Sequence, residues 1–406
     1  MSPQNKKTFL QGRLSPLLLA FHSSLNAFKA SLSLVNLTIL SDYQNSLSCE
    51  QTLSLWDKHL DIYKNTITQT FESQRLFLKG VQVYETAPRS LTPKMPPPLW
   101  TKGSAGLFDF GVKYSVTKRA VPVLFIPSLI NRSYIFDLYE EKGFFAFLAR
   151  HNIRPYLFDW GDQEKDKQTL SLENYLKNRL LPALHFLVQH TKKPVHIAGY
   201  CMGGLFATAL RSLAPGLARS LSLFATPWDF HQGNATPLMM QNIADWIKGT
   251  LPKDQRIPGD FLQLFFHALS PFSIQKKFQD LGLCHQKKSL LPPSYIALED
   301  WLNDTVSLSS HVFHECCTKW YQQNEPYHRE IVAGVNLQKE KTSSPAYLVT
   351  PTKDRLVPLK AAQGILSLMP HADVLAPPTG HVGIFGSRRA SEMVWQPYCA
   401  WLKHLH

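Results

Sequence analysis

Pro194-Val-His-Ile-Ala-Gly-Tyr-Cys-Met-Gly-Gly204 is the stretch that decides the fold of this 406-residue chain. A short, mostly apolar run leads into the pattern G-x-C-x-G-G, and a helical stretch follows from Leu205. A bend of this kind needs its glycines because the residue between them has a strained backbone that its neighbours crowd. The start of the helix offers N–H groups and the positive end of a dipole to an anion. Cys201 is therefore a candidate nucleophile, and the alternative is a buried, inert cysteine in a glycine-rich turn.

Strands and helices alternate on both sides of this bend. Short apolar runs predict strands at 121–126, 153–158, 195–198 and 221–224, and two late strands at 347–350 and 374–376. Helical stretches at 144–150 and 172–190 lie between the first four strands. This alternation predicts a mostly parallel, doubly wound sheet of the α/β class. Together with the bend at Cys201, it indicates the α/β-hydrolase fold.

The rest of the chain predicts helical additions to this sheet. Residues 1–92 form a helical N-terminal region, in which apolar residues from Leu14 to Val35 recur at steps typical of a basic amphipathic helix. We expect this helix either to pack on its own domain or to bind a lipid or polymer surface. Prolines at 93, 96, 97 and 98 then interrupt helix. The α/β core takes residues 93–228 and 344–406, and the aromatic-rich residues 229–343 form a helical cap insertion.

Two side chains that follow the late strands complete a candidate catalytic triad. On this fold the acid and then the histidine follow the nucleophile in chain order, in loops at the carboxyl ends of strands. Asp354 lies in the loop after 347–350, and His381 lies in a glycine-flanked loop after 374–376. An isolated Asp or His in a loop is usually a solvated surface residue. Here the chain order, the strand context and the glycine flanks agree with Cys201.

This triad predicts a mechanism. His381 takes the thiol proton, Asp354 fixes the tautomer of the ring, and the thiolate attacks an acyl carbon. The backbone N–H of Met202, directly after the nucleophile, would meet the oxyanion. A second N–H would come from Leu129 or Ile130 in the loop after the first strand, and of the two we assign Ile130. Sulfur favours acyl transfer from a thioester, because exchange of an acyl group between thiols is nearly balanced.

The amino-acid composition excludes several classes of protein. The 44% hydrophobic and 12% aromatic content excludes disordered and fibrous proteins. A net charge of +13 suits an anionic partner such as the phosphates of coenzyme A, although a basic surface is often merely solvated. No zinc-finger spacing, RNA-binding signature or long basic block supports nucleic acid binding. The six cysteines form no secreted-domain framework, and neither a signal peptide nor a membrane span is evident, so we expect a cytoplasmic location.

Two further groups of residues are left outside the predicted site. Cys316 and Cys317 with nearby histidines do not make a metal-ligand set, so we expect no metal and no bound cofactor. Trp301 and Asp304 are expected to pack and cap within the helical cap rather than to contact substrate.

Five motifs, in this order, resemble those of the poly(3-hydroxyalkanoate) synthases. They are Phe125–Leu138, Tyr156–Gly161, Gly199–Gly204, Thr352–Pro358 and Gly380–Gly383, and Glu299–Asp304 in the cap is similar too. The resemblance implies an acyltransferase that loads (R)-3-hydroxyacyl groups from coenzyme A onto Cys201 and builds polyester, with His381 as base and Asp354 assisting. It also implies a homodimer at the surface of an intracellular polyester granule.

The chain departs from that family in two respects. Arg355 stands where the family commonly has His directly after the acid. The N-terminal region resembles that of the short members, which often require a second synthase subunit. Two other functions stay open: a cysteine-dependent hydrolase of the same fold, such as an intracellular polyester depolymerase or thioesterase, and a non-catalytic granule-associated protein.

Overall fold

The computed structural model describes residues 24, 49–89, 92–162, 170–233, 237–250, 255–268, 271–286, 293–337 and 344–405. These residues form two compact units. One unit contains the described residues up to Arg89 together with Gln263–Ile296, and the other contains those of Ser90–Leu262 and Ala297–His406. The predicted basic helix between Leu14 and Val35 lies, except for Ser24, outside the described residues.

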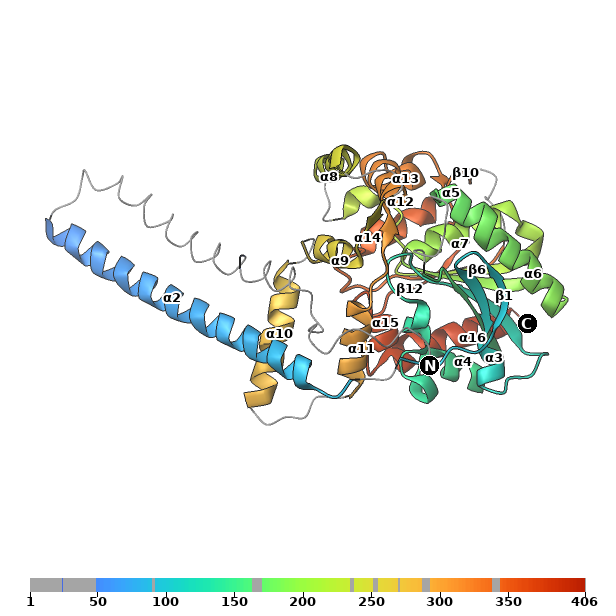
Figure 1. Cartoon of the computed structure of the whole chain (residues 1–406), viewed down its shortest axis with the longest axis horizontal. Coiled ribbons are helices and arrows are strands. Elements are labelled where there is room, and N and C mark those ends of the chain that lie inside the picture. The colour runs from blue at the N-terminus through green and yellow to red at the C-terminus, as the bar shows by residue number, and fades with distance from the viewer. Residues whose placement is uncertain are drawn as a thin grey trace. The chain divides into compact units, whose positions relative to one another are not determined.

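The larger unit is built on an eight-stranded sheet with the order β1-β2-β4-β3-β5-β6-β11-β12 (Figure 1). Its strands are β1 (Pro98–Lys102), β2 (Ala105–Asp109), β3 (Val121–Ile126), β4 (Ile153–Asp159), β5 (Val195–Tyr200), β6 (Ala218–Phe224), β11 (Ala346–Val349) and β12 (Asp373–Leu375). Neighbouring strands from β4 to β12 run parallel, whereas β1 with β2 and β2 with β4 pair antiparallel. The predicted mostly parallel sheet is confirmed.

Helices cover both faces of this sheet. They are α3 (Phe110–Lys113), α4 (Phe144–Arg150), α5 (Leu172–Asn174), the π-helix η6 (Tyr175–Leu180), α6 (Leu181–Thr191), α7 (Met202–Leu213), α14 (Leu359–Gln363), α15 (Gly383–Gly386), the π-helix η12 (Ser391–Trp395) and α16 (Gln396–His404). Figure 1 shows α4 and α16 on one side of the sheet and α6 and α7 on the other. Successive strand residues point to opposite faces. In β3, Val123 and Phe125 therefore pack with α4 and α16, whereas Leu124 and Ile126 are buried outside that cluster.

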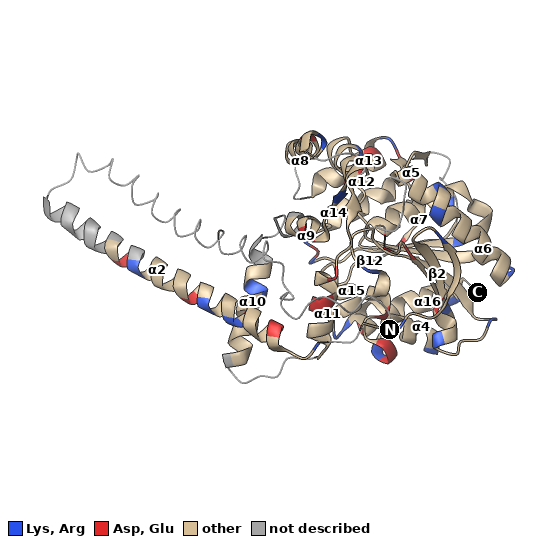
Figure 2. Ribbon diagram, in the orientation of Figure 1, with Lys and Arg blue, Asp and Glu red and all other residues tan. Residues whose placement is uncertain are grey.

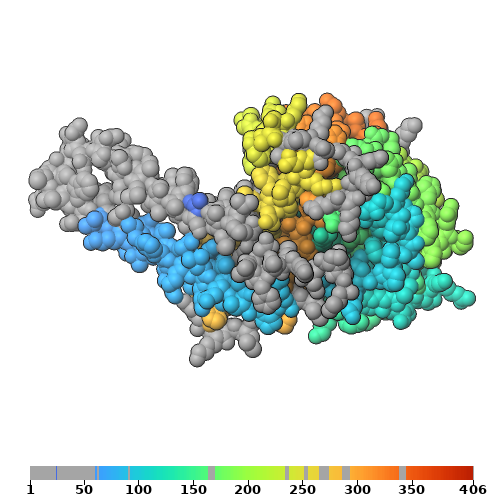
Figure 3. Space-filling view, in the orientation of Figure 1, coloured from blue at the N-terminus to red at the C-terminus, as the bar shows by residue number. Residues whose placement is uncertain are grey.

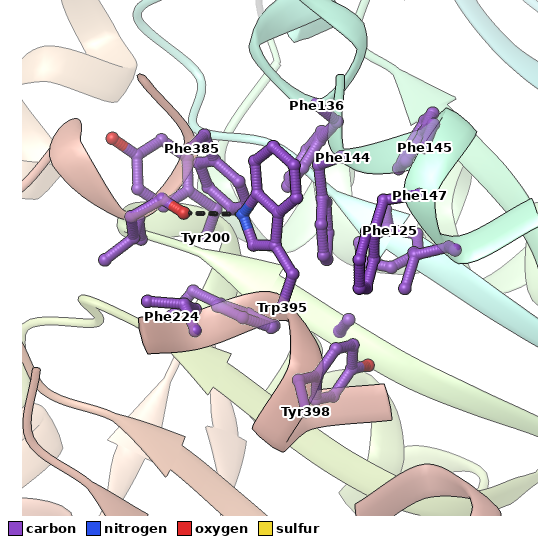
Figure 4. Close-up of a cluster of buried hydrophobic side chains, with 14 of the residues drawn as sticks. Phe125, Phe136, Phe144, Phe145, Phe147, Tyr200, Phe224, Phe385, Trp395 and Tyr398 are labelled. Carbon is purple, nitrogen blue, oxygen red and sulfur yellow. Dashed lines mark hydrogen bonds between the residues drawn. The ribbon is translucent and has the colours of Figure 1, made fainter. Parts of the chain in front are cut away.

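The core between the sheet and α4 and α16 is aromatic (Figure 4). The rings of Phe136 and Phe145 stack at 5.5 Å, and Phe144 packs 5.6 Å from Trp395. The indole of Trp395 donates to the carbonyl oxygen of Ile384 at 2.9 Å. Phe385 lies 5.1 Å from Phe136, and each such pair stabilises the fold beyond the area that it buries. This cluster thereby fixes α15, which directly follows the loop that carries His381.

The hairpin of β1 and β2 was not predicted from the sequence. Its strands are short, and β1 begins at Pro98 and is half exposed. Gly103 turns the chain between them with a φ of 61°. Proline at the first residue of an edge strand is compatible with pairing, because its missing N–H is not needed there. The cluster of prolines before residue 98 therefore marks the end of the helical region and, at once, the edge of the sheet.

Between β6 and β11 the chain is mostly helical, which confirms the predicted helical insertion. Its elements are α8 (Pro237–Thr250), β7 (Arg256–Ile257), α9 (Gly259–Ala268), α10 (Pro271–Gln286), α11 (Pro293–Asn303), β8 (Leu308–Ser309), α12 (Ser310–Glu315), the π-helix η9 (Cys316–Gln322), α13 (Glu325–His328), β9 (Ile331–Val332) and β10 (Val335–Asn336). In Figure 3, α8 in yellow lies beside the orange residues of α12 and η9. The insertion is divided between the two units: its described residues from 263 to 296 belong to the smaller unit, and its remaining described residues belong to the larger one.

The smaller unit is a packed pair of helices, α2 (Cys49–Thr86) and α10. Phe77 and Tyr84 of α2 pack on Phe278 of α10 with ring centroids 5.8 and 6.1 Å apart. Gly80 and Gly282 lie at the crossing, where a Cβ on either would overlap the backbone of the other helix. This pairing gives the unit its own small apolar core.

Charge is distributed over several elements of both units. Figure 2 shows Lys and Arg on α2, α6 and α10, with Asp and Glu interspersed along α2. The net charge of +13 therefore does not by itself mark a binding site. Within the described ranges, no helix combines the length and the apolar character needed to cross a membrane.

Candidate active site

Cys201 stands at the bend between β5 and α7. Its φ of 54° and ψ of −127° form a combination that L residues rarely adopt. The N–H of Cys201 donates to the carbonyl oxygen of Phe224, and the carbonyl oxygen of Cys201 accepts from the N–H of Gly204, both at 2.9 Å. These two bonds hold the strained turn. The side chain is half-buried, as a nucleophile that must meet a substrate requires.

The glycines around Cys201 are needed because the bend is crowded. A Cβ on Gly203 would overlap the carbonyl oxygens of Ile126 and Pro127 at the end of β3. A Cβ on Gly204 would overlap the side chain of Thr226. The bend therefore lies directly against the loop that follows β3, which the sequence analysis proposed as part of the oxyanion site.

Asp354 and His381 come from the loops after β11 and β12, which are adjacent and parallel. One carboxylate oxygen of Asp354 lies 2.7 Å from Nδ1 of His381. The other oxygen accepts the N–H groups of Leu356 and Val357, both at 2.9 Å. The Asp354 side chain is fully buried, and that of His381 is 11% exposed. Because Nδ1 is bound to the carboxylate, Nε2 is the nitrogen left to exchange a proton with another group.

The pKa of His381 depends on both of its partners, Asp354 and Cys201. Burial disfavours the charged ring, but the charges of Asp354 and of the Cys201 thiolate, with hydrogen bonds to both side chains, outweigh burial and raise the pKa of His381 to about 10. The raised pKa favours the imidazolium form of the ring. The structure brings Cys201, Asp354 and His381 together in one site.

The two proposed oxyanion donors lie on either side of the crowded contact between the bend and the loop after β3. Met202 is the first residue of α7, where an N–H has no partner within the helix. Ile130 is buried, and its N–H reaches the hydroxyl oxygen of Ser128 only at 3.5 Å, the limit of a hydrogen bond. Because this bond is weak, the Ile130 N–H is available to a developing oxyanion.

Sequence reasoning missed two tyrosines beside this site. The ring of Tyr200 lies 5.2 Å from the ring of His381, and its buried hydroxyl has no hydrogen-bond partner in the described part of the chain. Tyr321 of η9 packs on Phe230 at 4.8 Å. Burial first, and then the charge of Cys201, raise the pKa of the Tyr321 hydroxyl, which keeps it protonated. Tyr200 directly precedes the candidate nucleophile Cys201, but a tyrosine in a strand is usually interpreted as a core residue.

The other described thiols differ from Cys201. Cys316, Cys317 and Cys399 are buried, and burial raises the pKa of Cys317 and of Cys399 to about 12. Such thiols stay protonated and are poor nucleophiles. Cys284 is exposed but belongs to the smaller unit. Across the residues that the structure describes, no three His, Cys, Asp or Glu side chains are grouped to hold a metal ion.

The sheet order and the strand-bend-helix at Cys201 define the class of protein. The chain belongs to the alpha/beta hydrolase fold family, whose model matches residues 121–387. Within that class it is similar to the poly(3-hydroxyalkanoate) polymerase subunit PhaC of Thiocystis violacea, with 27% identity over 304 residues that cover 73% of this chain and 84% of that protein. The subunit PhaC of Allochromatium vinosum is 28% identical over 292 residues, covering 70% and 81%. These relatives confirm the resemblance to the poly(3-hydroxyalkanoate) synthases.

Among solved structures, the chain is similar to a monoacylglycerol lipase from Paleococcus ferrophilus. Its TM-score is 0.47 at 12% sequence identity, and the match covers 75% of this chain and 100% of that one.

Proposed function

We propose that this protein is an acyltransferase of the poly(3-hydroxyalkanoate) synthase type, which transfers (R)-3-hydroxyacyl groups from coenzyme A into a polyester. The observation that carries the proposal is the strained, half-buried Cys201 coupled to a His381 that Asp354 holds at 2.7 Å. The names of the relatives, which are polymerase subunits, support the same activity.

The first step loads the acyl group onto sulfur. Nε2 of His381 takes the proton of Cys201, and the raised pKa of the ring favours this thiolate–imidazolium pair. The thiolate attacks the carbonyl carbon of the acyl-CoA thioester, and the N–H groups of Met202 and Ile130 stabilise the oxyanion. The C–S bond to coenzyme A then breaks, and the departing thiolate takes the proton back from His381. The products are acyl-Cys201 and free coenzyme A.

The second step extends the polyester. Nε2 of His381, now neutral, takes the proton of the hydroxyl group of another 3-hydroxyacyl unit. That oxygen attacks the acyl-Cys201 carbonyl, an ester bond forms, and the thiolate of Cys201 leaves and is stabilised by the imidazolium. Asp354 holds the ring in the required tautomer through both steps.

The proposal extends to partners and location. Both relatives are named as polymerase subunits, which supports a requirement for a second synthase subunit. We place the protein in the cytoplasm, as a homodimer at the surface of a polyester granule, with acyl-CoA as substrate and no resident metal or cofactor.

The test is release of coenzyme A from 3-hydroxybutyryl-CoA and from longer 3-hydroxyacyl thioesters, with identification of the product. Wild type, with a synthase partner subunit present, should release coenzyme A and form insoluble polymer. Cys201→Ala should abolish both, whereas Cys284→Ala, which removes the exposed thiol of the other unit, should retain both.

Other products would decide between the alternatives. Soluble hydroxy acid in place of polymer would make the protein a hydrolase of the same site. No release of coenzyme A from any chain length, with Cys201 no more readily alkylated than Cys399, would favour a non-catalytic role.

A further inference from the structure

The loop after β3 is tied to the insertion by contacts with the segment Trp301–Val306, which we name the loop clamp. All of these residues belong to the larger unit. The N–H of Val306 donates to the carbonyl oxygen of Ile130 at 3.2 Å, and Thr305 pairs with Asn131 in an antiparallel bridge. The clamp therefore reaches the backbone of the residue that is proposed as the second oxyanion donor.

Side chains reinforce these backbone contacts. The indole of Trp301, which is 2% exposed, donates to the carbonyl oxygen of Arg132 at 2.8 Å. Asp304 accepts from the hydroxyl of Tyr134 at 3.0 Å and from Nε of Arg132 at 3.5 Å. Trp301 is buried, whereas the Asp304 side chain is partly exposed. Both hold the loop after β3 rather than the insertion alone.

The opposite side of the loop is held by the core. The indole of Trp160 donates to the carbonyl oxygen of Pro127 at 3.0 Å, and Gly203 lies against that same carbonyl. Between this attachment at Pro127 and the clamp at Ile130 only Ser128 and Leu129 remain, and both are buried. Attachment at both ends of so short a segment restricts the directions in which the Ile130 N–H can point.

We propose that Asp304 is a positioning residue, which through Tyr134 and Arg132 holds the Ile130 amide where the oxyanion forms. This inference rests on the proposed acyl transfer at Cys201. A misplacement of about 1 Å in such a group lowers a rate by about a hundredfold. The Asp304 side chain is 38% exposed, so its removal leaves no large cavity and the fold should persist.

The test separates acylation of Cys201 from the reactivity of its thiol. Acylation by 3-hydroxybutyryl-CoA needs the oxyanion donors, whereas alkylation by iodoacetamide passes through no oxyanion. In the full-length protein, with the synthase partner subunit present, Asp304→Ala should acylate Cys201 about tenfold to a hundredfold more slowly than wild type. Its rate of Cys201 alkylation, followed by mass spectrometry of the Cys201 peptide, should stay within about twofold, since the thiol and His381 are untouched.

Two further variants complete the design. Asp304→Asn keeps an acceptor for Tyr134 and should recover most of the acylation rate. Glu392→Gln, which removes an exposed carboxylate paired with Arg389, should acylate as wild type does.

Two other outcomes would contradict the positioning role of Asp304. If Asp304→Ala acylates at the wild-type rate, or loses acylation and alkylation in the same proportion, the positioning role is wrong while the proposed function stands. If wild type itself is never acylated, the proposed function fails and the positioning role fails with it.

Discussion

One carboxylate oxygen of Asp354 binds His381, and the other binds the backbone of the loop that carries Asp354. The orientation of the carboxylate is therefore set by its own loop, independently of the ring. The oxygen that meets Nδ1 lies 2.7 Å from it, and the second oxygen accepts two backbone N–H groups. The carboxylate can therefore orient His381 without turning away from it.

Asp354→Asn should lower the rate of coenzyme A release on the order of 10⁴-fold, because an amide nitrogen facing Nδ1 favours the wrong tautomer of the ring. The measurement is the single-turnover release of coenzyme A from 3-hydroxybutyryl-CoA. Glu173→Gln, which removes an exposed carboxylate paired with Lys177, is the matched control and should leave the rate unchanged. A rate for Asp354→Asn within a few-fold of wild type would exclude Asp354 from the triad.

His381 should make stability depend on pH. Its pKa in the folded protein is raised to about 10, above the value of about 6.5 expected in the unfolded chain. A group with a raised folded pKa stabilises fully below its unfolded pKa, and this contribution is lost as the pH rises through the folded value. The difference in free energy of unfolding between wild type and His381→Gln should therefore shrink between about pH 6.5 and pH 10.

Denaturant titrations over that range check the pH prediction, and Cys201→Ala refines it. Without the Cys201 sulfur one cause of the raised pKa of His381 is removed, so the stability difference should be smaller and should be lost at a lower pH. A difference that grows with pH would contradict the assignment of the ring as an imidazolium.

Gly203→Ala should destabilise the protein by about 1–3 kcal/mol or more, since the new methyl group would overlap two carbonyl oxygens at the end of β3. Backbone atoms cannot move aside as a flexible side chain can. Gly216→Ala is the control, because nothing lies within 4 Å of its Cβ position. Thermal unfolding of the two variants should separate them clearly, and equal stabilities would mean that the bend is looser than described.

A buried ion pair in the larger unit should matter far more than an exposed one. Arg154 and Asp109 meet at 2.6 Å with side chains 5% and 3% exposed. Asp109→Asn leaves the guanidinium buried without a countercharge and should cost about 3–5 kcal/mol of unfolding free energy. Glu72→Gln removes a partner of Arg75 from an exposed pair and should leave stability unchanged. Chemical denaturation of both variants tests this contrast.

The strands that carry the site were predictable because their signal is local. The apolar run at 121–126 coincides with β3, and the predicted helix at 144–150 coincides with α4. Order along the chain then indicated Asp354 and His381, since the family of folds fixes that order. β1 and β2 escaped prediction because Pro98 and Gly103 weaken the local strand signal at an edge.

The loop clamp could not be read from sequence for a different reason. Val306 and Ile130 are far apart along the chain, and their contact depends on how the insertion folds back on the core. Trp301 and Asp304 showed only that an aromatic and an acid lie close in a helical segment. Nothing local to either distinguishes a residue that packs from one that also orients a distant amide.

The backbone of Cys201 carries a consequence for how this protein can be engineered. A left-handed φ of 54° on a residue with a side chain costs about 1–3 kcal/mol, which glycine at the same position would not incur. Selection for heat resistance alone would therefore favour replacement of Cys201 by glycine, which removes the thiol. If Cys201 is the nucleophile, as proposed, a screen that ranks variants of this chain by melting temperature also needs a measurement of turnover, because its most stable variants would be inactive.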